Sequence, residues 1–403
     1  MAAATLMRLK GRLFAKESKS VPPPTSARPP CTCELSACCG GASSSNGGQQ
    51  PPKFDGTDED EKNSAASDSA VVVRCRRRAH TSAGEFARSL AQFERVCTIG
   101  AGTFGRVMLV VHRRTQQYYA LKVESIRHVV HKKQVDHVHN EKRILEQISH
   151  PFIVSLAWTW HDRKCLYLLF EYVPGGELFS YLRAMHRFSN NTANFYACEL
   201  VSALEYLHRM NVVYRDMKPE NLLLSRTGHM KLIDFGFAKI VDDRRTFTVC
   251  GTPEYLAPEI VEQRGHDKSV DWWGLGVLVF EMMAGYPPFR GDDARDTYER
   301  ILEAKPRFPK TFHPAAKDIV RKFLQKDPSA RLGGSKDDAA PVKRHKWFKG
   351  VDWLAVYQCL IPPPIVPTLY HDGDTGNYDA YKELDFGEFP AAPDKELAFF
   401  RNF

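Results

Sequence analysis

The apolar pattern of this chain changes its period once, at Pro174-Gly175-Gly176, and this change constrains the fold more than any other feature. Before it, alternating apolar residues at 107–111 and 118–123 indicate strands, and residues 134–147 indicate one helix. After it, apolar residues recur at helical spacing, with a second apolar helix expected around residues 272–283. The sequence therefore predicts an α+β fold with a small β-rich lobe and a larger helical lobe.

The chain divides further at its two ends. Residues 1–85 are polar and rich in Pro, Gly and Ser without a sustained apolar period, which predicts a disordered, low-complexity extension. We place the small lobe at 93–172 and the large lobe at 173–348. Residues 349–403 are rich in Pro and aromatic side chains, so we expect a tail that packs along the body of the protein.

Composition excludes several classes of protein. The apolar run from Trp272 to Phe280 is far shorter than the roughly 20 residues of a membrane helix, so no transmembrane segment is expected. Ten cysteines without a secretory signal indicate reduced thiols. We therefore expect a cytoplasmic protein, with nuclear or anchored pools left open. The net charge of +8 comes without a basic stripe interleaved with aromatics, so no nucleic-acid partner is expected.

The N-terminal extension carries two features that concern membrane anchoring. Ala2 follows Met1, so the glycine that N-myristoylation requires is absent. Four cysteines lie close together, at positions 31, 33, 38 and 39. Palmitoylation, a weak metal site and unstructured thiols all remain open for this cluster.

A glycine-rich segment follows the first strand, with Gly100, Gly102 and Gly105 in six residues. Glycines there let backbone amides approach phosphate oxygens, although a plain turn is the alternative. A strand, not a helix, follows, which favours a hairpin lid over a dinucleotide site. Lys122 lies in the next apolar strand and needs an anionic partner if it is buried. Glu141 on the following helix could hold it toward two phosphates; otherwise both are solvated surface residues.

Three later segments supply the other groups that phosphoryl transfer requires. They are residues 214–221 (Tyr-Arg-Asp-Met-Lys-Pro-Glu-Asn), 233–236 (Ile-Asp-Phe-Gly) and 251–259 (Gly-Thr-Pro-Glu-Tyr-Leu-Ala-Pro-Glu). Together they offer an acceptor for a hydroxyl proton, oxygen ligands for Mg²⁺ and cations that offset phosphate charge. With these motifs in this order, the chain resembles eukaryotic protein kinases from about residue 93 to 403. The resemblance implies the bilobal protein kinase fold.

The resemblance also implies roles for individual residues. Asp216 would be the catalytic base or the carboxylate that positions the substrate hydroxyl, and Lys218 would steady the γ-phosphoryl group of ATP. Asn221 and Asp234 would hold Mg²⁺, and Lys122 and Glu141 would form the activating ion pair. The nucleotide site would comprise Ile99, Gly100, Gly102, Gly105, Val107, Ala120, Lys122, Glu141, Glu171, Val173, Leu223 and Tyr378, with Phe170 behind it. Glu259 and Arg331 would form a buried structural ion pair.

Further features resemble the AGC group of Ser/Thr kinases, and its cyclic-AMP-dependent branch most closely. Tyr214 stands where most kinases have His, and residues 245–252 resemble that branch's activation loop. The chain ends on Phe400-Arg401-Asn402-Phe403, similar to the Phe-x-x-Phe end of a tail that wraps the small lobe. In residues 377–381, Tyr378 would lie against adenine and Tyr381 near the substrate arginine site. A turn-motif phosphosite has no clear counterpart in residues 386–396.

The same resemblance implies an activating phosphosite at Thr248. A phosphate there could pair with His137, Arg215 and Lys239, which otherwise lack a common partner. Arg245 lies three residues upstream, so both self-phosphorylation in trans and an upstream kinase are open.

Substrate preference is implied by charge. Glu177, Glu220, Glu254 and Glu281 match positions that receive substrate arginines in this family. An apolar residue after the phosphorylated one would lie on Val249, Pro253 and Leu256. We therefore expect substrates of the form Arg-Arg-x-Ser/Thr-apolar.

The implied partner is a cyclic-nucleotide-binding regulatory subunit with a pseudosubstrate segment, and an anchoring protein reached through it. Phe247 replaces the family's usual Trp, and Arg290 replaces a usual aromatic, so the ligand that releases this subunit stays open. An AGC kinase not controlled by cyclic AMP is the nearest alternative. A pseudokinase scaffold is disfavoured because Lys122, Asp216 and Asp234 are all present.

Overall fold

The computed structural model describes residues 90–102, 105–241, 245–383 and 389–403. The N-terminal extension and its cysteine cluster lie outside the described residues. In the part of the chain that is described, no helix combines the length and the apolar character needed to cross a membrane.

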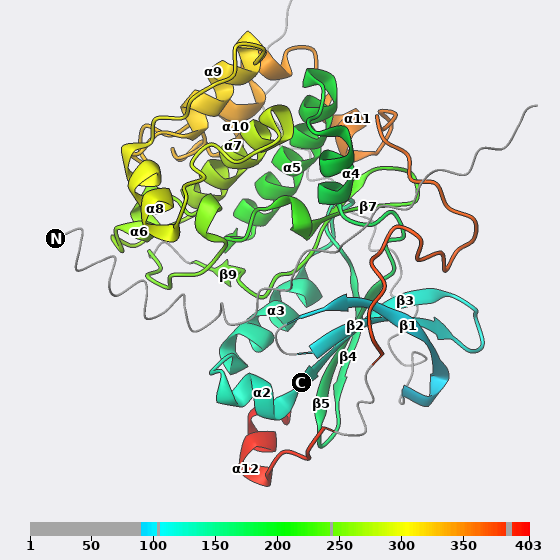
Figure 1. The fold of residues 1–403 in the computed structure, drawn as a ribbon. Coiled ribbons are helices and arrows are strands. Elements are labelled where there is room, and N and C mark those ends of the chain that lie inside the picture. Colours follow the sequence, from blue (N-terminus) through cyan, green and yellow to red (C-terminus); the bar gives the residue numbers. More distant parts are fainter. Residues whose placement is uncertain (1–89, 103–104, 242–244, 384–388) are drawn as a thin grey trace, which may run out of the picture. The chain divides into compact units, whose positions relative to one another are not determined.

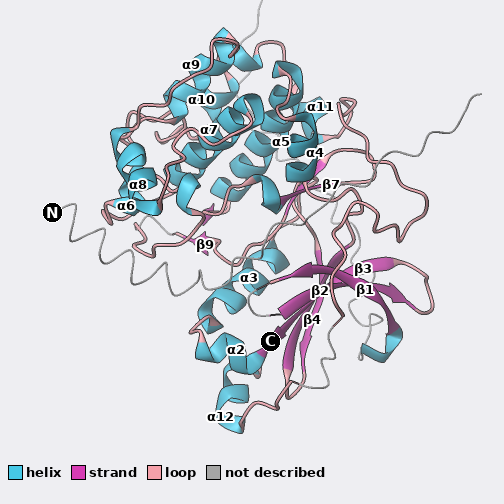
Figure 2. Ribbon diagram, in the orientation of Figure 1, coloured by secondary structure: helices cyan, strands magenta, loops and turns pink. Residues whose placement is uncertain are grey.

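The small lobe is built on a five-stranded antiparallel sheet with the strand order β1-β2-β3-β5-β4 (Figures 1 and 2). A short 3₁₀ helix, η1 (Leu90–Gln92), leads into it. The strands are β1 (Phe93–Ala101), β2 (Gly105–His112), β3 (Tyr118–Ser125), β4 (Leu156–His161) and β5 (Cys165–Glu171). Two helices follow β3, namely α2 (Ile126–His131) and α3 (Val135–Gln147). The predicted strands and helix are confirmed, with ends shifted by one or two residues.

Alternation along β3 gives the sheet two different faces. Tyr119, Leu121 and Val123 are buried in one apolar cluster with side chains of β2 and β5. Because successive strand residues point to opposite faces, Ala120 and Lys122 lie on the other side of the sheet. The face that carries Lys122 is therefore separate from this small-lobe core.

The large lobe is mainly helical. Its elements are α4 (Leu178–Met185), α5 (Asn190–Arg209), β6 (Val212–Val213), η2 (Pro219–Asn221), β7 (Leu222–Leu224), β8 (Met230–Leu232), β9 (Lys239–Ile240), η3 (Pro253–Tyr255), α6 (Pro258–Val261), α7 (Ser269–Ala284), α8 (Ala294–Glu303), α9 (Pro314–Phe323), α10 (Ala339–Lys343), η4 (Lys346–Phe348) and α11 (Trp353–Tyr357). Two short antiparallel pairs, β6 with β9 and β7 with β8, carry the segments between α5 and α6.

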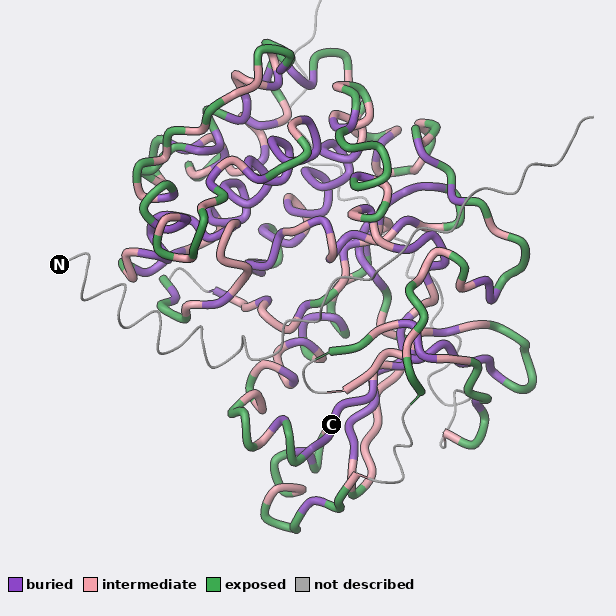
Figure 3. The backbone as a smooth tube through the Cα atoms, viewed as in Figure 1, coloured by how far each residue is buried: buried purple, intermediate pink, exposed green. Residues whose placement is uncertain are grey.

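Helix α7 forms the centre of the large lobe. Apart from Ser269, Asp271 and Glu281 it is apolar, and every residue from Ser269 to Met283 is buried, which appears as purple at the place of α7 in Figure 3. The helix ends at Gly285, whose φ of 85° belongs to the left-handed region. A Cβ at this position would lie 2.3 Å from the carbonyl oxygen of His186, so only glycine fits.

The tail returns from the large lobe to the small lobe and ends there. Its last elements are α12 (Asp394–Leu397) and η6 (Ala398–Phe400), and Figure 1 shows α12 beside α2. Phe400 is fully buried in a cluster with Ile126, Val129 and Val138. The expectation that the tail wraps the small lobe is confirmed.

Candidate active site

Asp216 is the centre of a polar cluster between β6 and β7. It is 2% exposed. One oxygen, Oδ2, accepts from Lys218 Nζ at 2.8 Å and from Asn221 Nδ2 at 2.9 Å. The other oxygen, Oδ1, accepts from Thr252 Oγ1 at 3.2 Å. These contacts hold both oxygens of Asp216 and bring Thr252, from the segment 251–259, to residues 214–221, which we call the catalytic loop.

Lys218 is a cation that lies beside the carboxylate of Asp216. Burial alone would lower its pKa, but Asp216, Asp234 and Glu220 outweigh burial and raise the pKa of Lys218. The ammonium group therefore stays charged in the pH range in which the protein works.

The backbone of the catalytic loop is held by a residue that the sequence analysis did not single out as functional. Asp271 on α7 accepts from the amides of Tyr214 and Arg215, at 2.9 and 2.8 Å. Arg215 has a φ of 70°, an uncommon conformation for a residue other than glycine. The two hydrogen bonds to Asp271 stabilise this strained turn and so orient Asp216.

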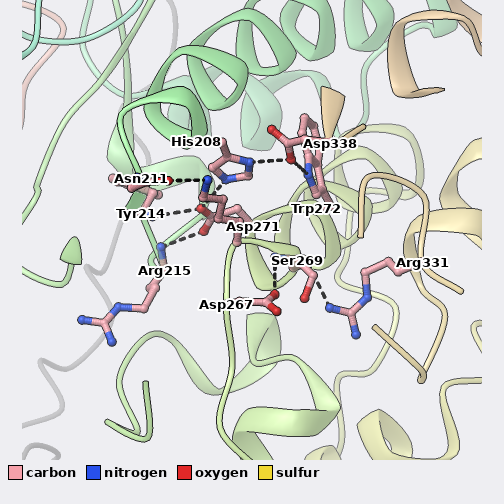
Figure 4. A network of polar contacts seen from close by, with 11 residues as sticks. His208, Asn211, Tyr214, Arg215, Asp267, Ser269, Asp271, Trp272, Arg331 and Asp338 are labelled. Carbon is pink, nitrogen blue, oxygen red and sulfur yellow. Dashed lines mark hydrogen bonds and ion pairs between the residues drawn. The ribbon is translucent and has the colours of Figure 1, made fainter. Parts of the chain in front are cut away.

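Asp271 is itself part of a longer buried network, drawn in Figure 4. His208 contacts Asp271 through Nε2 and Asp338 through Nδ1, each at 2.9 Å. Asp338 also accepts from Trp272 Nε1 at 2.8 Å. A charged residue in the first turn of an otherwise largely apolar helix is costly to bury alone, and that is the sequence signal by which Asp271 could have been found.

The hairpin of β7 and β8 places the two expected metal ligands at its open end. Asn221 precedes β7, Asp234 follows β8, and the amide of Ile233 donates to the carbonyl oxygen of Asn221 at 2.9 Å. The side-chain nitrogen of Asn221 donates to Asp216, which leaves its oxygen as the acceptor end. Asp234 is exposed, and its Oδ1 accepts from the amide of Gly236 at 3.2 Å. An amide oxygen and a carboxylate form a donor set that suits a hard divalent cation.

Lys122 and Glu141 form the predicted ion pair between β3 and α3. Lys122 Nζ lies 2.9 Å from both Oε1 and Oε2 of Glu141. Glu124, which the sequence analysis did not identify, lies 3.5 Å from the same ammonium group. Burial would lower the pKa of Lys122, but Glu124, Glu141 and Asp234 raise it well above its usual range. The alternative that Lys122 and Glu141 are solvated surface residues is wrong, because β3 lies between β2 and β5 and the side chain of Glu141 is buried.

The glycine-rich segment forms the turn of the β1–β2 hairpin. Gly102 donates its amide to the carbonyl oxygen of Gly105 at 3.0 Å. A Cβ on Gly105 would lie only 1.6 Å from the carbonyl oxygen of Val123 on β3, so this position requires glycine. The predicted hairpin is confirmed. Thr103 and Phe104 at its tip lie outside the described residues.

The apolar residues expected around adenine come from four different strands. Ile99, Val107 and Ala120 lie on the neighbouring strands β1, β2 and β3. Leu223 lies on β7 and forms an isolated antiparallel bridge with Glu177. Glu177 belongs to the segment between β5 and α4, which connects the two lobes. Their role in binding a nucleotide stays a prediction.

The tail contacts the same connecting segment. Tyr378 donates from its hydroxyl group to the carbonyl oxygen of Val173 at 2.5 Å and stacks on Tyr172 at 6.1 Å between ring centroids. Glu383 accepts from the amide and the hydroxyl of Thr98, both at 2.7 Å. Thus two tail residues contact segments beside the expected nucleotide site, one at Val173 and one next to Ile99.

The basic residues expected to bind a phosphate on Thr248 have different individual surroundings. Thr248 is exposed. Arg215 Nε donates to the carbonyl oxygen of Phe237 at 2.7 Å, whereas its Nη1 is buried without a hydrogen-bond partner among the described residues. Lys239 donates to Thr246 at 3.0 Å, and His137 contacts Gln134 at 2.6 Å. An anion near Arg215 would satisfy a polar group that is otherwise left unpaired.

Three of the four glutamates predicted to bind substrate arginines line one cavity of about 460 Å³. They are Glu220, Glu254 and Glu281, and Arg290 lies on the same wall. Burial raises the pKa of Glu281 to about 7; the Tyr255 hydroxyl opposes this, whereas Glu220 and Glu254 add to it. Arg183 and His186 also line the cavity, and its three carboxylates lie close enough to raise the pKa of Glu281, which favours a cation beside them.

Other residues predicted to bind substrate, and the predicted structural ion pair, lie outside the lining of this cavity. Glu177 lies outside the cavity lining, but burial and the charge of Glu220 raise its pKa. Leu256 is buried, whereas Val249 and Pro253 are half-buried. Arg331 and Glu259 form the predicted buried pair, with N–O distances of 2.7 and 2.9 Å.

Comparisons with known proteins agree with this geometry. The family model described as "Protein kinase domain" matches residues 93–348. The human "cAMP-dependent protein kinase catalytic subunit PRKX" is 52% identical over 315 residues, which cover 78% of this chain and 88% of that protein. A Caenorhabditis elegans "cAMP-dependent protein kinase, catalytic subunit-like" protein is 56% identical over 295 residues, 73% of this chain and 74% of the relative. The "cAMP-dependent protein kinase catalytic subunit" of Dictyostelium discoideum is 52% identical over 301 residues, 75% of this chain and 46% of that protein.

Proposed function

This chain belongs to the protein kinase family, and we propose that it phosphorylates Ser and Thr residues that follow arginines, with Mg²⁺ accompanying ATP. The relatives support a Ser/Thr kinase of the cyclic-AMP-dependent type, an enzyme that uses ATP and a divalent metal on protein substrates. The metal, the substrate sequence and the regulatory partner are proposed from the residues of the site.

The single observation that carries the proposal is the set of hydrogen bonds around Asp216. Its two oxygens face Lys218, Asn221 and Thr252. When a substrate hydroxyl oxygen bonds to the γ-phosphorus, the bond from that phosphorus to the bridging oxygen of ADP breaks. The hydroxyl proton needs an acceptor, and Asp216 supplies a fixed carboxylate for it. Lys218 offsets negative charge on the transferred group.

Mg²⁺ is the divalent cation that we propose for Asn221 and Asp234. Such an ion neutralises phosphate charge when it is bound. Mg²⁺ is commonly held by one or two carboxylates together with substrate phosphates. The described residues contain no cluster of three or more His, Cys, Asp or Glu side chains suited to a metal, which agrees with a site that the nucleotide completes.

The nucleotide would lie between the strands of the small lobe and β7. We propose that Ile99, Val107, Ala120 and Leu223 contact the adenine ring and that backbone groups of Glu171 and Val173 bind its edge. Tyr378 supports this placement, since its hydroxyl group is bonded to Val173. Gly100, Gly102 and Gly105 would allow the backbone to approach the phosphates.

Substrate arginines would enter the acidic cavity. Glu220, Glu254 and Glu281 line it together, and a guanidinium group can pair with carboxylates through two parallel hydrogen bonds. We propose Glu177 as a further contact and Val249, Pro253 and Leu256 as the seat of the apolar residue that follows the phosphorylated one. The preferred sequence is then Arg-Arg-x-Ser/Thr-apolar.

We further propose a regulatory subunit as a partner of this chain. The human and Dictyostelium discoideum relatives are named as catalytic subunits of cAMP-dependent protein kinases. A pseudosubstrate segment with arginines would fit the same acidic cavity. Phe247 precedes the cavity residue Thr252 within residues 245–252 and is 64% exposed, so it offers an additional apolar contact. Anchoring would then be indirect, through the regulatory subunit, and the site of action cytoplasmic.

The test is phosphorylation of an Arg-Arg-Ala-Ser-Leu peptide by the full chain with ATP and Mg²⁺. The matched control is Asp216→Asn, which keeps the size of the side chain but removes the carboxylate. We expect its kcat to fall about 10²- to 10⁴-fold while its affinity for ATP stays within about twofold. An Asp216→Asn enzyme with unchanged kcat would disprove the assignment of the base. Absence of phosphorylation by the wild-type chain would disprove the function.

A regulatory subunit from the same source provides the second arm. Inhibition that cyclic AMP relieves would support regulation of the cyclic-AMP-dependent type. Inhibition that cyclic AMP does not relieve would assign the chain to an AGC kinase under other control and leave the catalytic assignment intact.

A further inference from the structure

Arg290 lies at the rim of the acidic cavity, on the loop between α7 and α8. Its Nε lies 4.0 Å from Oε1 of Glu254, and its side chain is 70% exposed. Glu220 and Glu281 line the same cavity together with Arg183 and His186, but among the described residues neither glutamate forms an ion pair within 4.0 Å, whereas Glu254 pairs with Arg290. Glu254 thus differs from the other two glutamates because it already has a guanidinium partner.

The loop holds Arg290 at this place through contacts on both sides. The preceding residue, Phe289, is buried and stacks on Trp273 with 5.4 Å between ring centroids. The carbonyl oxygen of Arg290 accepts from Arg300 at 2.6 Å, and the next amide, of Gly291, donates to Thr297 at 3.0 Å. The starting point of the side chain is therefore fixed, while the side chain itself can move.

The charge of Arg290 acts on more than one carboxylate. It lowers the pKa of Glu254 and of Glu281, against the effect of burial, which raises both. A guanidinium at this rim therefore offsets part of the acidity that would attract a substrate arginine.

We propose that Arg290 determines substrate specificity by occupying Glu254 and so competing with one upstream arginine of the substrate. This inference rests on the proposed function and assigns a specificity role within it. A substrate arginine that reaches Glu254 must displace Arg290, so part of its binding free energy is lost. The enzyme then discriminates weakly at that one upstream position and more strongly at the positions served by Glu220 and Glu281.

The test compares Arg290→Ala with wild type on peptides in which single upstream arginines are replaced by Ala. Arg295→Ala is the matched control, because Arg295 is an equally exposed arginine on α8 that pairs with Glu299 and lies outside the cavity lining. Replacing an upstream arginine of the peptide by Ala raises KM by some factor. For one upstream position, we expect this factor to be about two- to fivefold larger in Arg290→Ala than in wild type, the range of exposed ion pairs. The kcat should change by less than about twofold, and Arg295→Ala should behave like wild type.

Two further variants make the result specific. Arg290→Lys keeps the charge and should retain the wild-type preference. Glu254→Gln added to Arg290→Ala should remove the larger arginine dependence of KM, because the carboxylate that Arg290→Ala frees is then absent. The larger dependence should also shrink at high salt, since exposed charges are screened.

Three results would overturn the proposal. One is the same arginine dependence of KM in wild type and Arg290→Ala. Another is that Arg290→Ala improves KM equally for a peptide that contains no arginine. The third is a loss of activity on peptides with an upstream Asp, which would make Arg290 a receiver of acidic residues. In each case the peptides are still phosphorylated, so the proposed function stands; if wild type phosphorylates none of them, the function itself fails.

Discussion

The Oδ2 atom of Asp271 lies 2.9 Å from Nε2 of His208 in the interior of the large lobe. Both side chains are almost completely buried. His208 contacts Asp338 with its other nitrogen, and Asp271 holds the backbone of the catalytic loop. The orientation of Asp216 therefore depends on a charged network that lies behind the loop.

The charge of His208 predicts a specific dependence of stability on pH. Burial would lower the pKa of His208, but its hydrogen bonds with Asp271 and Asp338 and their charges raise it from 6.5 to about 9. A group with a raised pKa stabilises the folded state fully below its unfolded pKa, and this stabilisation is lost as pH rises through its folded pKa. The loss between about pH 6.5 and 9 is on the order of 3 kcal/mol.

The measurement is the free energy of unfolding of wild type and His208→Gln from pH 6 to 9.5. The difference between the two should be largest at pH 6 and shrink as the pH rises. A difference that stays constant over this range would contradict a charged His208.

The buried pair of Glu259 and Arg331 predicts a large loss of stability when one partner is removed. The side chain of Arg331 has no exposed area, so Arg331→Met leaves the carboxylate of Glu259 buried and unpaired. The expected cost in the free energy of unfolding is about 3–5 kcal/mol, measured by urea denaturation. Arg331→Met combined with Glu259→Gln should cost less than Arg331→Met alone; an equal or larger cost would argue against charge as the cause.

Phe400 and Phe399 provide a matched pair of variants for the tail. Phe400 is fully buried and stacks on His139 of α3 at 5.4 Å, whereas Phe399 is 55% exposed. Phe400→Ala should destabilise the small lobe by about 3 kcal/mol, because a buried aromatic is lost. Since α3 also carries Glu141, kinase activity should fall as well. Phe399→Ala should leave thermal stability and activity unchanged, and similar effects of the two variants would contradict a stabilising role for the buried ring of Phe400.

Phosphorylation of Thr248 should increase activity. A phosphate near Arg215 would pair with its buried Nη1, and one or two charge-assisted hydrogen bonds correspond to a gain of about tenfold or more in kcat/KM. The measurement compares phosphatase-treated and untreated enzyme, with Thr248→Ala as the unphosphorylated reference. In Arg215→Ala the effect of phosphatase should become smaller. Full activity of the treated enzyme would refute the prediction.

Residues that act close together along the chain were predicted well. Lys122 and Glu141 are 19 residues apart, on a strand and the helix after it, and the apolar pattern of both elements was clear. The β1–β2 hairpin and the catalytic loop were likewise predicted from local motifs. Glu124, two residues from Lys122, was missed because a polar residue in a strand gives no sign of which cation it faces.

Contacts between distant segments could not be predicted in this way. Asp271 is 57 residues from Tyr214, and nothing in the sequence of α7 shows which backbone amides its carboxylate will meet. Arg290 was recognised as a departure from the family, but its contact with Glu254 depends on how the α7–α8 loop lies against η3. Both contacts arise from the packing of helices.

The sequence by itself determined the two-lobe fold and which residues are candidates for phosphoryl transfer. Strand and helix periods are local properties, and the catalytic motifs are contiguous. Only the tertiary structure decided which glutamates share a cavity, that Arg290 lies beside one of them, and that Asp271 and His208 support the catalytic loop. The physical reason is that burial and charge pairing depend on the distance in space between segments, which the order of residues does not specify.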